Sequence, residues 1–146
     1  YNNKISIIDS QDAVYGNKAY DLASLIDDVR LKTSKDLKEK IYQIYLNLNN
    51  KKINKLNFKN DFEILSVLRN LKIIGIFTRL STRDKKNQYL KLIPYAWKLI
   101  EQRIENNKKF IELKNILDKY FAKKIRAKKW KKLIPLLFCV QDMVKD

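Results

Sequence analysis

Apolar residues recur along most of the chain at intervals of three and four, which is the spacing of an amphipathic helix. The first such segment covers residues 18–31, and Asn17 precedes it as a candidate N-cap. Its apolar face consists of Ala19, Leu22, Ala23, Ile26 and Val29. A second helix is expected after Thr33, because Thr33 and Asp36 have the spacing of a capping box. Residues 49–57 are polar and predict a loop.

A long helical pattern then runs from residue 58 to about residue 80, and residues 73–77 are apolar nearly all round, as in a buried helix. Gly75 lies in this stretch, where a glycine costs about 1 kcal/mol of helix propensity. Close packing against a neighbouring element would offset that cost.

The remainder of the chain also predicts helices. One is expected over residues 88–106, with Pro94 in its first turns, and another over residues 109–121. One or two more are expected over residues 126–144, kinked or split by Pro135.

Only residues 4–8 read as a strand, since they are short and rich in β-branched side chains. The fold class predicted is therefore mainly α, with one strand feeding a bundle of roughly five to seven helices. Residues 1–146 are expected to form one domain, with the strand and its loop in residues 1–16 and the bundle in residues 17–146. A lone strand is not stable without a partner. We therefore expect the functional unit to include residues before Tyr1.

Composition excludes several classes of function. The chain has no histidine, so it supplies no imidazole base, no histidine metal ligand and no Ser-His-Asp triad. Its two glycines are far apart, which excludes a glycine-rich phosphate loop. One cysteine, Cys139, permits no disulfide within the chain and favours a reducing, cytoplasmic setting. Neither a signal peptide nor an apolar run long enough for a bilayer span is found.

The net charge of +16 has two interpretations. The densest basic segment, residues 123–132 around Trp130, has the composition of a site for single-stranded nucleic acid. A solvated helix face with Trp130 packed inward is the other explanation for this segment. For the chain as a whole, Lys, Asn and Ile are all encoded by AT-rich codons, so a genome of low GC content would raise the frequency of all three. Lysine also far outnumbers arginine, whereas specific phosphate recognition favours arginine. We favour the compositional explanation, and a nucleic-acid partner is the alternative.

Asp9 is the main chemical candidate, because it follows the strand directly. A carboxylate at the end of a strand is held rigidly, which suits a Mg²⁺ ion that binds few carboxylates and the phosphates of a nucleotide. A plain turn aspartate is the alternative. The segment Asp9-Ser10-Gln11-Asp12-Ala13, then Gly16 and residues 19–25 (AYDLASL), resembles the aminoglycoside phosphotransferase superfamily, whose fold is protein-kinase-like.

More narrowly, the sequence is similar to bacterial kinases that phosphorylate the anomeric hydroxyl of N-acetylmuramate and N-acetylglucosamine in cell-wall recycling. A second block carries this likeness, namely residues 71–80 (LKIIGIFTRL), then Arg83-Asp84-Lys85 and Tyr89-Leu90. The resemblance covers about residues 5–105. Ser10 departs from it, because the family usually has an aromatic residue there.

The resemblance implies the C-terminal helical lobe of an α+β phosphotransferase that uses ATP and Mg²⁺ and acts on a small-molecule acceptor. Asp9 matches the metal-binding aspartate, and Asp21 matches a structural helix aspartate that ties the catalytic region together. Candidate loop or substrate contacts are Gln11, Asp12, Arg79 and Arg83, although each arginine has an alternative as an ion-paired or solvated residue.

The ATP-binding lobe and catalytic loop would precede Tyr1, so the isolated chain is expected to be inactive. An aminoglycoside or choline acceptor is the alternative within the superfamily. Outside the superfamily, the alternative is a basic nucleic-acid-binding module without catalysis.

Overall fold

The computed structural model of the chain describes residues 15–49, 53–105 and 107–127, and every regular element in these ranges is helical. The α-helices are α1 (Ala19–Ile26), α2 (Lys35–Leu48), α3 (Lys55–Thr82), α4 (Ile93–Ile104), α5 (Ile111–Tyr120) and α6 (Lys123–Arg126). Two 3₁₀ segments, η2 (Asn87–Leu92) and η3 (Lys108–Phe110), precede α4 and α5. The prediction of a mainly α fold is thereby confirmed. The expected strand over residues 4–8 lies outside the described residues, as does nearly all of the expected helical segment over residues 126–144.

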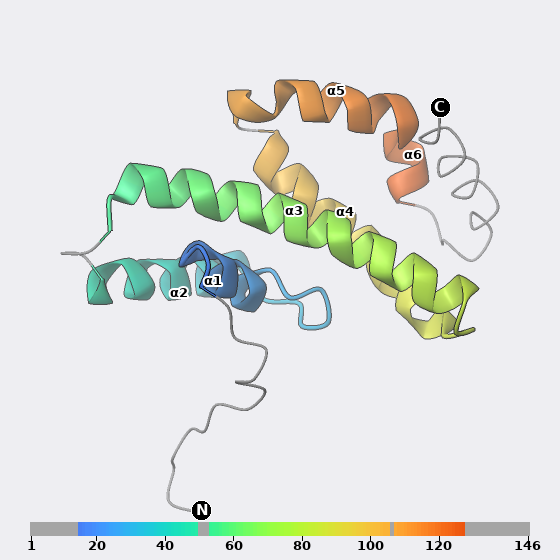
Figure 1. Cartoon of the computed structure of the whole chain (residues 1–146), viewed down its shortest axis with the longest axis horizontal. Helices are drawn as coiled ribbons and strands as arrows, with labels where there is room; N and C mark the ends of the chain where they lie inside the picture. The colour runs from blue at the N-terminus through green and yellow to red at the C-terminus, as the bar shows by residue number, and fades with distance from the viewer. Residues whose placement is uncertain (1–14, 50–52, 106, 128–146) are drawn as a thin grey trace, which may run out of the picture.

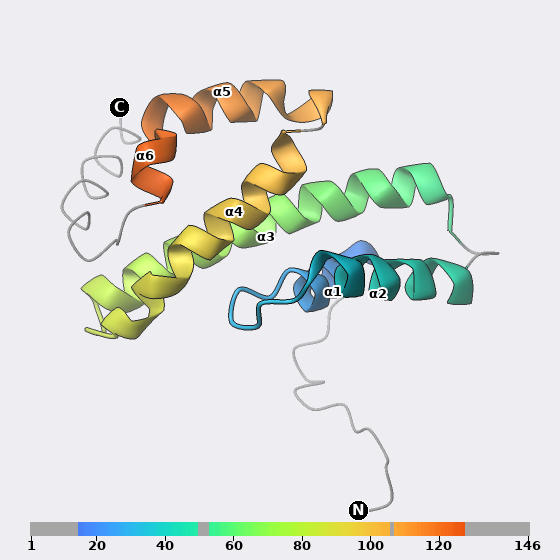
Figure 2. The same cartoon turned by 180° about the vertical axis from the view of Figure 1, so that it is seen from behind.

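Helix α3 is the central helix of the bundle, and it contacts α1, η2 and α4. Figures 1 and 2 show α1 and α2 along one side of it, α4 packed lengthwise against it, and α5 beyond α4. None of the helices in the described ranges is long and apolar enough to cross a membrane. The two sides of α3 carry separate sets of buried apolar side chains, which differ in size.

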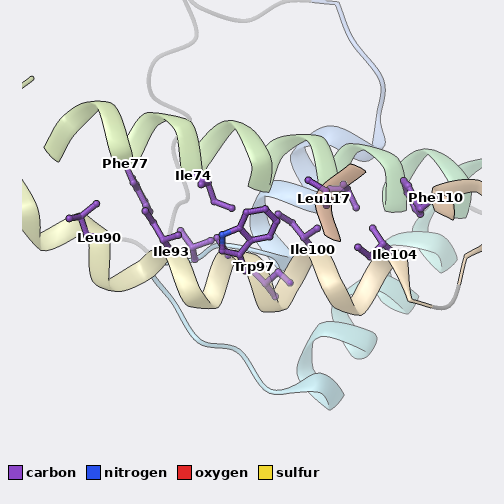
Figure 3. Packing of buried hydrophobic residues seen from close by; sticks show 13 residues of the cluster. Ile74, Phe77, Leu90, Ile93, Trp97, Ile100, Ile104, Phe110 and Leu117 are labelled. Atoms are coloured by element: carbon purple, nitrogen blue, oxygen red, sulfur yellow. The ribbon is translucent and has the colours of Figure 1, made fainter. Parts of the chain in front are cut away.

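The larger apolar cluster lies between α3, α4 and α5 (Figure 3). Trp97 of α4 is at its centre and is only 2% exposed. Apolar residues recur on α4 at helical spacing, so one face is buried against α3 while Lys98 and Gln102 face solvent. Each Å² of apolar surface removed from water contributes about 25 cal/mol to the free energy of unfolding. The other buried members are Val29, Val67, Ile74, Phe77, Leu90, Ile93, Ala96, Leu99, Ile100, Ile104, Phe110 and Leu117.

The smaller cluster joins α1 and α2 to the first half of α3. Phe58 and Phe62 of α3 meet the ring of Tyr42, at centroid distances of 6.1 and 5.0 Å. Leu46 of α2 is also buried in this cluster. The helix predicted over residues 18–31 ends at Ile26, and its apolar face supplies four buried residues to this cluster, namely Ala19, Leu22, Ala23 and Ile26. The fifth residue of the predicted face, Val29, follows the helix and is buried in the larger cluster.

The N-terminal boundary of α2 differs from the one predicted. The helix is capped by Ser34, whose hydroxyl accepts a hydrogen bond from the Leu37 amide at 3.3 Å. Thr33 instead donates to the Leu31 carbonyl, so the predicted capping box is wrong.

Asparagine side chains stand at the starts of α1 and α3. Asn17, the predicted cap of the first helix, lies one residue before the observed N-cap, Lys18, and its side chain accepts a hydrogen bond from the Ala19 amide at 2.9 Å. Asn54 accepts from the Asn57 amide at 3.1 Å, and α3 therefore begins three residues earlier than predicted.

Residues 87–104 form two elements and not one helix, since η2 gives way to α4 at Ile93, beside Pro94. A proline is tolerated in the first turn of a helix and not within it, which places the break there.

Arg126 fastens the short helix α6 to the bundle. Its guanidinium donates to Glu101 of α4 at 3.1 Å and to Asp118 of α5 at 2.6 Å. It also lies 5.0 Å from the centre of the Trp97 ring, a cation–π contact. The arginine side chain is 3% exposed, so its charge is held away from bulk water.

Gly75 lies on an exposed turn of α3, and a Cβ at this position would meet nothing within 4 Å. The expected close packing against this glycine is therefore wrong for the described residues. Residues 73–77 are buried on one side only, through Ile74 and Phe77.

We predict that Gly75→Ala raises the free energy of unfolding by about 1 kcal/mol, because alanine is the better helix former and the site has room for it. Urea denaturation of the two proteins measures the difference. Loss of stability in the variant would mean that another element approaches this face.

The turn after α3 contains a residue in the left-handed region, Lys85, with φ of 55°. The hydrogen bond from the Lys86 amide to the Leu80 carbonyl, 3.0 Å, closes this turn. A residue with a Cβ is disfavoured in that conformation, whereas glycine is not.

Lys85→Gly is accordingly expected to stabilise the chain by about 1 kcal/mol. Lys86→Gly, at φ of −84°, is the matched control and should give no gain. Thermal denaturation of the three proteins tests this prediction, and an equal effect of both glycines would contradict it.

Candidate functional site

Three of the residues proposed from sequence, Asp9, Gln11 and Asp12, lie outside the described residues. Their segment leads to the N-terminal end of α1 through residues 15–17. A hollow of about 310 Å³ lies at this end of α1, between residues 16–18 and the start of α3. Its wall is tied together by the hydrogen bond from the Asn17 side-chain amide to Asp61, 2.7 Å.

Asp21 lies in the first turn of α1, where a negative charge is favourable because the helix N-terminus is positive. Its side chain is exposed and has no hydrogen-bond or ion-pair partner in the part of the chain that the structure describes. Tyr20 and Leu25 of the same helix are also exposed, at 41% and 65%. Among the described residues, the outer face of α1 is therefore left uncovered.

Arg79 and Arg83 lie one turn apart at the C-terminal end of α3, and both are exposed. Arg83 is ion-paired, since its Nε and Nη2 atoms donate to the two carboxylate oxygens of Asp84 at 2.6 and 3.0 Å. These hydrogen bonds are the main reason that the pKa of Asp84 is lowered. Arg83 thus adopts its ion-paired alternative, whereas Arg79 has no such pair among the described residues.

The structure does not bring the two arginines together with Asp21. Helix α1 packs against α3 near Phe58 and Phe62, and Arg79 follows Phe62 after an axial rise of about 25 Å. Within the described ranges, no group of three or more His, Cys, Asp or Glu side chains is placed to hold a metal ion.

The most constrained polar group was not anticipated from the sequence. Asp27 follows α1 directly, and its carboxylate is 1% exposed. It accepts from Lys38 of α2 at 2.8 Å, Ser66 of α3 at 2.5 Å and Arg103 of α4 at 2.9 Å. Arg69 also donates to the Asp27 carbonyl, at 3.3 Å. One residue at the end of α1 therefore connects α2, α3 and α4.

The pKa of Asp27 is set by opposing effects. Burial raises it, but the Arg103 charge and the hydrogen bonds from Lys38 and Ser66 together outweigh burial, so the pKa is lowered from its ordinary 3.8. The carboxylate is therefore held in its charged form at neutral pH.

Asp27 and its side-chain partners Lys38, Ser66 and Arg103 are called the Asp27 cluster. One signal in the sequence could have pointed to this cluster. Asp27 is four residues after Ala23, which places an acidic side chain beside the apolar face of α1. Ser66 and Arg103 interrupt the apolar faces of α3 and α4 in the same way.

A groove of about 530 Å³ opens beside this ion cluster, between α2, the first half of α3 and the end of α4. Lys38 and Arg103 belong both to its lining and to the Asp27 cluster. Burial is the main reason that the pKa of Tyr42, another lining residue, is raised, with the charges of Glu39 and Glu63 adding to it.

No protein-family model matches the chain. Over 94 residues it is 33% identical to the N-acetylmuramate/N-acetylglucosamine kinase of Caulobacter vibrioides, a match that covers 64% of the chain and 26% of the relative. The chain thus spans about a quarter of the length of this relative. The match is distant and partial homology, and it relates the chain to a protein named as an amino-sugar kinase.

The Asp27 cluster predicts a defined pH dependence of stability. Because the pKa of Asp27 is lower in the folded chain than in the unfolded one, its contribution is complete above the unfolded value near 3.8 and is lost as pH falls through the folded value. Asp27→Asn should reduce the free energy of unfolding by about 3 kcal/mol at pH 7, since it leaves two cations without their anion. The difference from the unmodified chain should shrink below pH 3.8.

Urea denaturation at pH 7 and at about pH 2.5 measures both quantities. Asp36→Asn is the matched control, because Asp36 is an exposed residue of α2. A difference for Asp27→Asn that is the same at both pH values would contradict the assignment.

Proposed function

We propose that this chain is the C-terminal helical part of an ATP-dependent kinase that phosphorylates an amino sugar of the N-acetylmuramate or N-acetylglucosamine type. The observation that carries the proposal is the homology to the amino-sugar kinase of Caulobacter vibrioides over 94 residues. Two sequence blocks that resemble this class of kinase, around Asp9 and around residues 71–90, also support it.

The helical architecture is consistent with this proposal. Asp21 lies in the first turn of α1, after the segment that carries Asp9, and its carboxylate has no partner among the described residues. We assign to Asp21 hydrogen bonds with the catalytic region of the intact enzyme. The exposed Tyr20 and Leu25 on the same helix provide apolar surface against which that region would pack.

Asp9 is the residue that we assign to Mg²⁺, since carboxylate oxygens are among the ligands that this ion prefers in proteins. When bound, the ion neutralises negative charge on the transferring phosphoryl group. Asp9 alone supplies neither the base nor the remaining phosphate contacts, so the isolated chain is expected to have no kinase activity. We place no catalytic base within residues 1–146.

The proposal predicts strict dependence on Asp9. In a chimera that joins the upstream part of the Caulobacter vibrioides kinase to residues 1–146, Asp9→Ala should lower the rate of ATP-dependent phosphorylation of N-acetylmuramate or N-acetylglucosamine by at least about 100-fold. The reason is that the change removes an electrostatic contact on which the transition state depends. Asp36→Ala, a change at an exposed carboxylate of α2, should leave the rate nearly unchanged.

Activity that survives Asp9→Ala would refute the metal assignment. Turnover by residues 1–146 alone would refute the proposal that the catalytic loop lies elsewhere. If the chimera phosphorylates an aminoglycoside or choline and not the amino sugars, the proposed acceptor is wrong and the assignment as a kinase stands.

A further inference from the structure

The groove beside Asp27 has the size of a ligand site and a mainly polar lining. Its volume of about 530 Å³ falls within the usual range of small-molecule pockets, roughly 300–1,000 Å³. It lies at the C-terminal end of α1, next to Ile26, whereas the segment with Asp9 joins the N-terminal end of that helix. Two apolar side chains, Ile26 and Phe62, contribute to its lining.

Basic side chains are the first component of the lining. Two of them, Lys38 and Arg103, are already committed to Asp27. In the described ranges, Lys35 and Lys59 have no ion pair, so their ammonium groups are available as donors.

Three carboxylates also line the groove, and only some of their hydrogen-bond acceptor positions are occupied. Glu39 accepts from Gln43 at 2.7 Å, and Glu63 accepts from Asn107 at 2.6 Å. Glu105 is paired with Lys123 at 3.4 Å. A carboxylate has about four acceptor positions, so each of them can accept further hydrogen bonds. Hydrogen-bond donors and acceptors therefore lie side by side in the groove, and the positive and negative charges of its lining nearly cancel.

This arrangement selects a class of ligand. A phosphate or another compact anion would be attracted by Lys35 and Lys59 but repelled by the three carboxylates, and a polycation would meet the reverse situation. A hydroxyl group both donates and accepts, so several hydroxyls on one small ring match alternating ammonium, amide and carboxylate groups.

We propose that this groove is a binding site for a small, polyhydroxylated molecule without net charge. The ligand bridges α2 to the end of α4 through Lys35 and Lys59 on one set of its hydroxyls and Glu63 and Gln102 on another. Occupancy stabilises the junction at Asp27, because the ligand contacts helices that the ion cluster joins. The site is independent of the proposed kinase activity, since it needs neither ATP nor any residue upstream of α1.

The test is a titration of the full chain with N-acetylglucosamine as the probe, followed by ¹H–¹⁵N chemical shifts, without nucleotide. We expect saturable binding in the millimolar range, with the shifted amides in α2, the first half of α3 and the end of α4. Lys59→Ala and Gln102→Ala should each weaken binding by about 3- to 10-fold, which is the loss of one neutral or singly charged hydrogen bond. Both side chains are exposed, so thermal denaturation should show no loss of stability.

Lys72→Ala is the matched control, because Lys72 is exposed on α3 but does not line the groove. It should leave the affinity unchanged. Absence of saturation, or equal weakening by Lys72→Ala and Lys59→Ala, would overturn the proposal. Inorganic phosphate that binds more tightly than the sugar at the same amides would also overturn it, because the groove would then be an anion site. None of these results depends on whether the chimera phosphorylates an amino sugar.

Discussion

The arrangement of the helices depends on one buried charge. The Asp27 carboxylate is almost fully shielded from solvent, and such a group is tolerated only when it is paired and hydrogen-bonded. Lys38, Ser66 and Arg103 supply these partners from three different helices. Because the two apolar clusters lie on different sides of α3, this carboxylate is a polar contact that ties α2 directly to α4. The groove opens beside this carboxylate, and two of its partners, Lys38 and Arg103, line it.

The polar features of the chain lie at different places along the bundle. The segment with Asp9 enters at the N-terminal end of α1, the groove opens at its C-terminal end, and Arg79 and Arg83 lie far along α3. The two arginines therefore do not share a site with Asp21 within the described residues. In the proposed enzyme, Asp9 and Asp21 belong to the phosphoryl-transfer region, and the turn after α3 forms a separate surface feature.

Features of the fold that depend on neighbouring residues in the sequence were predicted, whereas features that depend on contacts between distant residues were not. The apolar face of α1 follows from spacing alone, so Leu22 and Ile26 are buried as expected. The start of α2 was misplaced by one residue because Thr33 and Ser34 are both competent caps, and only backbone geometry chooses between them.

The ion cluster required information that is not local. Ser66 and Arg103 are distant from Asp27 along the chain, and their pairing with it is set by tertiary packing. The residue proposed for metal binding, Asp9, lies outside the described ranges, so that part of the site stays a prediction.

Helix α3 is covered by different partners along its length, and this has a consequence for the cooperativity of opening. Its first half loses its cover only if α1 and α2 separate from Phe58 and Phe62, and its second half only if α4 separates from Ile74 and Phe77. The backbone amides near Ser66 lie where both groups of helices meet. These amides should therefore exchange with deuterated solvent only through global unfolding, while the ends of the same helix exchange through smaller openings.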